Sequence, residues 1–179
     1  MSQKRTEWIE KSYALVAKNG FESLNVNLIS RTVGKSKSSF YHHFGDLELF
    51  NMALLDYHVN QMNDFSAKID ACDNIYPGMI HIFLEHQMDI FFHKQLRIHR
   101  VEPTYKKHIE KIFQVYENAV LEQWNNQFGL NHQNQFSIKF KRFISEHFFL
   151  SITQENYTFD WLKAYLDQIS DMIQQMKAL

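Results

Sequence analysis

The stretch from Asn25 to Phe50 constrains this chain more than any other part of its sequence. It contains two short segments with apolar residues at helical spacing, and Gly34 separates them. Glycine adopts positive φ at little cost and therefore often ends a helix. Asn25 and Ser36 each stand where a side-chain oxygen can cap the first turn of a helix. Two short helices joined by a tight turn predict a helix-turn-helix.

The second segment of this stretch carries side chains that suit a helix lying against DNA. We expect Phe40, Tyr41 and Phe44 to supply its apolar contacts. The other positions are basic, small or hydrogen-bonding: Lys35, Lys37, Ser38, Ser39, His42 and His43. Such side chains contact phosphates and base edges in protein–DNA complexes.

Residues 9–50 resemble the DNA-binding domain of the TetR family of bacterial transcriptional regulators. The family pattern opens with an amphipathic helix and a Gly-aromatic pair, here Gly20-Phe21. It closes with the run Gly-x-Ser-Lys-small-small-apolar-Tyr-x-His-Phe, which here extends from Gly34 to Phe44. The resemblance implies an all-α fold. The resemblance also implies a helix-turn-helix DNA-binding domain at 1–50 and a helical ligand-binding and dimerisation domain at 51–179.

Three positions depart from the family pattern. Lys35 replaces a residue that is usually apolar, Ser38 replaces a glycine or alanine, and Leu47 replaces a lysine that can meet a phosphate. The helix-turn-helix prediction survives these changes, but the phosphate contacts and the base sequence that is read depend on them.

The resemblance implies a dimeric regulator, most simply a repressor, whose two recognition helices read a palindromic double-stranded operator. We expect Asn25, Ser36, Lys37 and Tyr41 to hold phosphates. The residues expected to contact DNA are Asn25, Asn27, Lys35, Ser36, Lys37, Ser38, Ser39, Tyr41 and His42.

Composition supports a soluble helical protein. The chain is 45% hydrophobic and has 16 Phe, but only 5 Gly and 2 Pro, which argues against a turn-rich all-β fold. The single cysteine, Cys72, excludes an internal disulfide framework and predicts a reducing, cytoplasmic location. No apolar run is long enough to span a membrane. Residues 1–50 carry seven Lys and Arg against five Asp and Glu, so the basic excess lies at the predicted DNA-binding end.

Two C-terminal segments repeat apolar residues at spacings of four and three, which favours packing against another helix at a shallow angle. The pattern predicts either an internal helix pair or a four-helix interface between two subunits, and the family resemblance implies the interface. The expected homodimer residues are Phe136, Phe140, Phe143, His147, Leu162, Leu166, Ile169, Ile173 and Met176.

A small-molecule site is predicted where polar residues interrupt apolar helical faces. Gln87, Tyr116 and Gln123 are such residues, although each could also be a satisfied core residue. With Phe83 they form the expected ligand-binding set, and the many aromatic side chains suggest an apolar or aromatic effector.

Ten histidines raise the question of a metal. No Asp or Glu is followed by His three residues later, as paired metal sites in helical bundles require. His86, Asp89 and His93 could form a partial site, but solvated or hydrogen-bonded histidines are the simpler interpretation. No catalytic constellation is present, so we expect no enzyme activity, no cofactor and no metal. The alternatives are a helical metal-binding protein or enzyme, or a regulator that responds to a protein partner.

Overall fold

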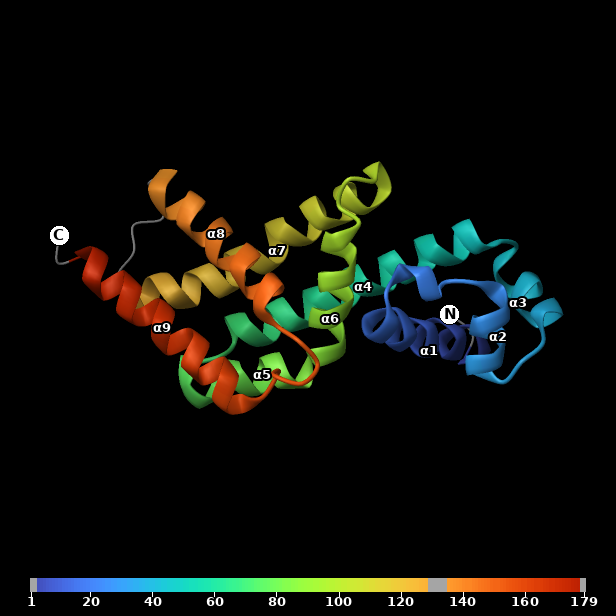
Figure 1. Ribbon diagram of the computed structural model, residues 1–179, viewed down its shortest axis with the longest axis horizontal. Helices are drawn as coiled ribbons and strands as arrows, with labels where there is room; N and C mark the ends of the chain where they lie inside the picture. Colours follow the sequence, from blue (N-terminus) through green and yellow to red (C-terminus); the bar gives the residue numbers. More distant parts are fainter. Residues whose placement is uncertain (1–2, 129–134, 178–179) are drawn as a thin grey trace. The chain divides into compact units, whose positions relative to one another are not determined.

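The computed structural model describes residues 3–128 and 135–177, and over these residues it contains helices and no strand (Figure 1). The predicted all-α fold class is confirmed. The helices are α1 (Gln3–Asn19), η1 (Phe21–Ser23), α2 (Val26–Val33), α3 (Lys37–Phe44), α4 (Leu47–Asp70), η2 (Ile75–Met79), α5 (Ile80–Glu85), α6 (Gln87–Ile98), α7 (Pro103–Phe128), α8 (Gln135–Ser151) and α9 (Phe159–Lys177).

The boundaries of α2 and α3 follow from local side-chain chemistry. Oδ1 of Asn25 accepts the N–H of Leu28 at 2.8 Å, and Oγ of Ser36 accepts the N–H of Ser39 at 3.2 Å. Gly34 ends α2 in the left-handed conformation, with φ 77° and ψ 32°. The predicted caps and the predicted turn are therefore confirmed.

An aromatic cluster holds the recognition segment in place. Trp8 of α1 is fully buried, with its ring centroid 5.6 Å from that of Phe40 and 6.5 Å from that of Phe44. Phe50 of α4 lies 5.1 Å from Phe40 and 4.6 Å from Phe44. Edge-to-face packing of this kind adds to the stabilisation from burial. It fixes the inner face of α3 and leaves the other face to solvent.

The chain forms two compact units, Met1–Asp64 with Met88–Gln114, and Phe65–Gln87 with Val115–Leu179. Tyr13 of α1 stacks on Phe92 of α6 at 4.2 Å and meets Tyr57 of α4 edge-on at 5.0 Å. The helix-turn-helix therefore shares its core with part of α4 and most of α6.

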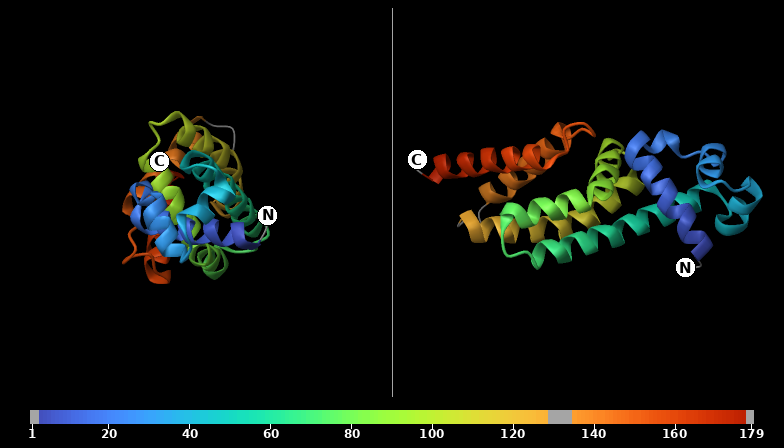
Figure 2. Two further views of the ribbon diagram at one scale, coloured as in Figure 1. Left: turned by 90° about the vertical axis from the view of Figure 1, so that its right-hand side faces the viewer. Right: turned by 90° about the horizontal axis from the view of Figure 1, so that it is seen from below.

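In the second unit, α8 and α9 lie side by side, and α9 also packs against α5 (Figure 2). The Tyr165 hydroxyl on α9 donates a hydrogen bond to the backbone carbonyl of Ile144 on α8 at 3.0 Å. The Tyr157 hydroxyl, just before α9, donates to the carbonyl of Phe83 on α5 at 3.0 Å.

Two helix boundaries differ from what the sequence pattern predicts. Thr6 is a candidate cap for the first helix, but α1 begins at Gln3. Pro77 suits the first turn of a helix whose apolar stripe extends to Phe91, and in the structure it directly follows Tyr76, whose φ −120° and ψ 124° are non-helical. The apolar stripe does not form one continuous helix, because at His86 φ −92° and ψ 24° leave the helical region and α6 begins at Gln87.

None of the helices in the described ranges is long and apolar enough to cross a membrane.

Candidate nucleic-acid interface

The helix α3 presents two chemically different faces. Phe40 and Phe44 are buried against α1 and α4. Lys37, Ser38, Tyr41 and His42 are exposed, and Ser39 is half-buried. Because residues four apart lie one above the other on a helix, Lys37 with Tyr41 and Ser38 with His42 form two parallel rows. The exposed face thus combines a cation, a hydroxyl, a phenol and an imidazole, all of which can hydrogen-bond to DNA.

The start of α2 adds further polar groups. Asn25 and Asn27 are both exposed, and the Asn25 side chain is engaged in capping the helix. Backbone N–H groups and the positive end of the helix dipole favour anions at a helix N-terminus. Ser36 caps α3 in the same manner and is also exposed.

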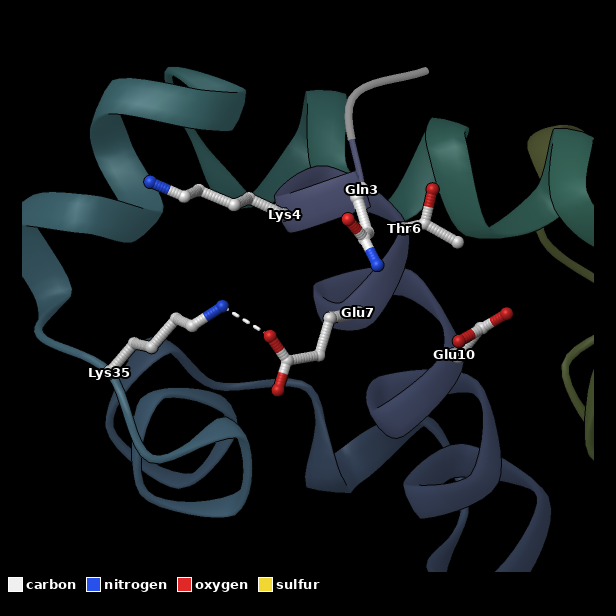
Figure 3. Close-up of a pocket in the computed structure, with 6 residues that line it drawn as sticks. All are labelled: Gln3, Lys4, Thr6, Glu7, Glu10 and Lys35. Atoms are coloured by element: carbon white, nitrogen blue, oxygen red, sulfur yellow. Dashed lines mark hydrogen bonds and ion pairs between the residues drawn. The ribbon is translucent and has the colours of Figure 1, made fainter.

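Lys35 is placed differently from its neighbours. Its ammonium group forms an ion pair with Glu7 of α1, and the two side chains reach toward one another across a hollow on the surface (Figure 3). Lys11 also donates to Glu7 at 3.0 Å and to the carbonyl of Val33 at 3.3 Å. The hydrogen bonds from Lys35 and Lys11 lower the pKa of the Glu7 carboxyl to about 2. Lys35 was expected to contact DNA, and in the structure its charge is shared with a carboxylate.

Glu7 was not among the residues singled out from the sequence. The only local signal was the i, i+4 spacing of Glu7 and Lys11, which is common on exposed helices. The contact with Lys35 spans 28 positions and depends on how α1 packs against the turn after α2.

The expected dimer residues divide into two groups. Leu162, Ile169 and Ile173 are buried within the chain's own unit, so they belong to internal packing and do not form a free face. Leu166 and Phe140 are half-buried, while Phe143 and His147 on α8 are exposed. The side chains of Phe136 and Met176 lie outside the described residues. Among the described residues of α8 and α9, the exposed large apolar side chains are those of Phe143, Leu150 and Met172.

The expected ligand residues have varied surroundings. Phe83 is buried, with its ring centroid 5.1 Å from Phe65 and 5.8 Å from Phe148. The Gln123 amide donates to the carbonyl of Ile69 at 3.1 Å, so one of its groups is satisfied by the fold. Gln87 is half-buried, and the Tyr116 side chain lies outside the described residues.

The histidines considered for a metal do not converge. Nε2 of His86 lies 3.1 Å from Nζ of Lys68, in a different compact unit from Asp89 and His93. Among the residues that the structure describes, no three or more His, Cys, Asp or Glu are arranged to hold a metal ion.

Comparison with known proteins agrees with this geometry. Residues 9–48 match the family described as bacterial regulatory proteins, tetR family. The HTH-type transcriptional repressor AcnR of Corynebacterium diphtheriae is 26% identical over 127 residues, which cover 68% of this chain and 64% of the relative. The chain thus spans slightly under two thirds of that repressor's length.

A solved structure shares the fold over nearly the whole chain. It is the crystal structure of a putative TetR-family transcriptional regulator from Rhodococcus sp., with a TM-score of 0.60 and 15% identity. The match covers 94% of this chain and all of that one. Residues 9–48 therefore match the tetR family of bacterial regulatory proteins, and nearly the whole chain shares the fold of the Rhodococcus protein.

Proposed function

We propose that this protein is a transcriptional regulator that represses genes by binding double-stranded operator DNA. The observation that carries the proposal is the exposed polar face of α3, which the Trp8, Phe40 and Phe44 cluster holds rigidly outward. The similarity to a transcriptional repressor over 127 residues supports the same function.

Each exposed residue of the interface has a proposed role. Lys37 and Tyr41 bind phosphates and, with the capped helix ends at Asn25 and Ser36, set the orientation of the domain. Asn27 joins them from α2. Ser38, Ser39 and His42 lie toward base edges in the major groove and determine sequence preference. Lys35 adds its positive charge to this face when its ion pair with Glu7 opens.

We further propose that two copies bind a palindromic operator. A two-fold dimer places two recognition helices in successive major grooves, about 34–36 Å apart or a multiple of that distance. Phe143 and Leu150 leave apolar surface on α8 that a second copy can cover, and His147 lies between them on the same helix. The remaining expected interface residues on α9 would support this surface from inside the fold.

A small molecule is the proposed input signal. Phe83, Gln87, Tyr116 and Gln123 all belong to the second compact unit, and an apolar or aromatic effector suits their mixture of rings and amides. Binding there would shift α4, which contributes residues to both units. Regulation requires that the effector bind the DNA-free conformation more tightly than the DNA-bound one.

Selection of bound sequences from a random pool of double-stranded DNA tests the proposal. We expect enrichment of an inverted repeat, and loss of that enrichment when Ser38 and His42 are both replaced by alanine. A parallel selection with a metal chelator separates this function from a metal-dependent one. Failure to enrich any sequence, with or without chelator, would refute the proposed function.

A further inference from the structure

Four buried polar side chains form a hydrogen-bonded chain inside the first compact unit. Tyr13 comes from α1, His58 from α4, and Asp89 and His93 from α6. The Tyr13 oxygen lies 2.8 Å from Oδ1 of Asp89 and 2.7 Å from Nδ1 of His58. Nε2 of His58 lies 3.2 Å from Nδ1 of His93. Asp89 and His93 are the two ends of this chain and lie one helical turn apart on α6, and the four side chains together are called the ring below.

With both imidazoles neutral and Tyr13 donating to Asp89, the three hydrogen bonds require one placement of protons. The Tyr13 hydroxyl donates its proton to the Asp89 carboxylate, so its oxygen accepts from Nδ1–H of His58. The neutral His58 ring then has a lone pair on Nε2, which accepts from Nδ1–H of His93. Two facing nitrogens 3.2 Å apart have room for one proton between them. If both rings were protonated, two N–H groups would face each other and the contact would break.

We propose that this ring positions α1 against α4 and α6 for DNA binding, and that acid opens it and weakens DNA binding. The inference rests on the proposed function and adds a proton as a second regulatory input. In the ring, Tyr13, His58, Asp89 and His93 are positioning residues, because none of them lies on the exposed face of α3.

Burial explains why protons favour an open form. A buried imidazolium loses its hydration, so the closed ring resists protonation. In the open form, the hydrated imidazoles of His58 and His93 take up protons at the ordinary histidine pKa near 6.5. Each proton bound only by the open form shifts the equilibrium between open and closed forms tenfold per pH unit below that value. Two histidines therefore shift the equilibrium between open and closed forms by up to a hundredfold per pH unit.

The charges around the ring also oppose protonation of its two histidines in the closed form. Burial and the nearby His108 of α7 lower the pKa of His58 to about 3. Burial, His58 and Arg97 of α6 hold the pKa of His93 well below its ordinary value. The one carboxylate of the ring, Asp89, is shared with the Tyr13 hydroxyl.

Two further groups face the ring from the side. Tyr57 of α4 lies edge-on against the Tyr13 ring, and its own pKa is raised by burial, by Glu10 of α1 and by Asp89. A phenol whose pKa is raised stays neutral across the acid range. It adds no positive charge that could hold the ring closed.

The experiment measures the affinity of the whole chain for its selected operator from pH 8.0 to pH 5.5 at constant ionic strength. For the unchanged protein we expect the affinity to fall with acid, with a slope that exceeds one proton and approaches two. His93→Asn keeps an N–H donor toward His58 but cannot take up a proton, so its slope should not exceed one. Tyr157→Phe removes a buried hydroxyl from the second unit and should keep the full slope.

A second measurement does not depend on DNA. Nitrogen-15 spectra of the histidines should show His58 and His93 both protonated at Nδ1 at pH 7.5. Amide exchange should show that α1 loses protection at pH 5.5, and less so in His93→Asn. Affinity that is constant or rises with acid, or equal slopes in the unchanged protein and His93→Asn, would overturn the inference. If no DNA binds at any pH, the proposed function fails. The spectra and the exchange data then test by themselves whether acid opens the ring.

Discussion

The apolar surface of α8 provides the sharpest test of the proposed dimer. Phe143 is 60% exposed and Leu150 is 79% exposed, whereas Ile169 on α9 is 4% exposed. A glutamate at Phe143 should therefore disrupt contact between subunits. A glutamate at Ile169 should disrupt the fold of each subunit.

The Phe143 substitution should change the free energy of dimerisation, and the Ile169 substitution should change the free energy of unfolding. An aromatic side chain covers on the order of 200 Å² when fully buried, so about 120 Å² of Phe143 remains for a partner to cover. At roughly 25 cal/mol per Å² this is about 3 kcal/mol per copy, or about 6 kcal/mol for both copies of a two-fold dimer. That corresponds to about a 10⁴-fold weaker dimer. Deleting buried side-chain volume at Ile169 costs about 2–5 kcal/mol even without a charge, a large part of the net stability of a typical domain.

Sedimentation and circular dichroism on three variants distinguish these effects. We expect Phe143→Glu to give a helical monomer, Ile169→Glu to give a largely unfolded chain, and Gln174→Glu on the exposed part of α9 to remain a helical dimer. The reasoning is refuted if Phe143→Glu stays dimeric at micromolar concentration, or if Ile169→Glu gives a folded monomer.

Three further predictions concern single side chains. Tyr41→Phe should weaken binding to all DNA sequences about equally, by roughly 1 kcal/mol, because a phosphate contact carries no base information; a changed sequence preference in a new selection would contradict this role. Lys37→Ala should reduce the slope of log K against log salt by about one per subunit, and an unchanged slope in a salt titration would exclude the contact. Burial and Asp89 raise the pKa of Tyr13 well above 10 in the folded protein, so the stability that this group contributes is complete below pH 10 and is lost as pH rises further. Urea unfolding above pH 10 should show a shallower loss in Tyr13→Phe than in the unchanged protein.

The parts of the fold that were predicted correctly depend on neighbours within a few positions. The caps at Asn25 and Ser36 and the left-handed turn at Gly34 are set by short-range hydrogen bonds and by backbone sterics. The resemblance of residues 9–50 to a known family then supplied the three-dimensional arrangement of these pieces. Local chemistry and family pattern pointed to the same helix-turn-helix.

Patterns of apolar spacing were less informative about what covers a face. The repeat through Leu162, Ile169 and Ile173 identifies one buried side of α9, but a helix of the same chain and a helix of a partner bury that side equally well. The structure places these residues in internal packing. The break at His86 was missed for a related reason, since no glycine or proline marks it.

The buried ring could not have been found from the sequence. Its members come from positions 13, 58, 89 and 93, and only the spacing of Asp89 and His93 gave a local signal. That signal suggested a partial metal site. In the structure the same two side chains hold a tyrosine and a histidine. Side chains that ligate metals also form hydrogen-bonded networks, and only the tertiary arrangement separates the two.

The pairing of Lys35 with Glu7 leads to a last prediction about DNA affinity. Because the pKa of Glu7 is held to about 2 by its two lysine partners, the carboxylate stays charged at any pH at which the protein would be studied. Only a mutation can release Lys35. Glu7→Gln removes one negative charge near the proposed DNA surface and frees the lysine, so operator affinity should rise and its salt dependence should become steeper by up to one per subunit. Glu10→Gln on the same helix removes the same charge without freeing Lys35 and should have the smaller effect. Equal effects of the two variants would show that Lys35 contributes only general charge, and an unchanged salt slope in Glu7→Gln would remove Lys35 from the interface.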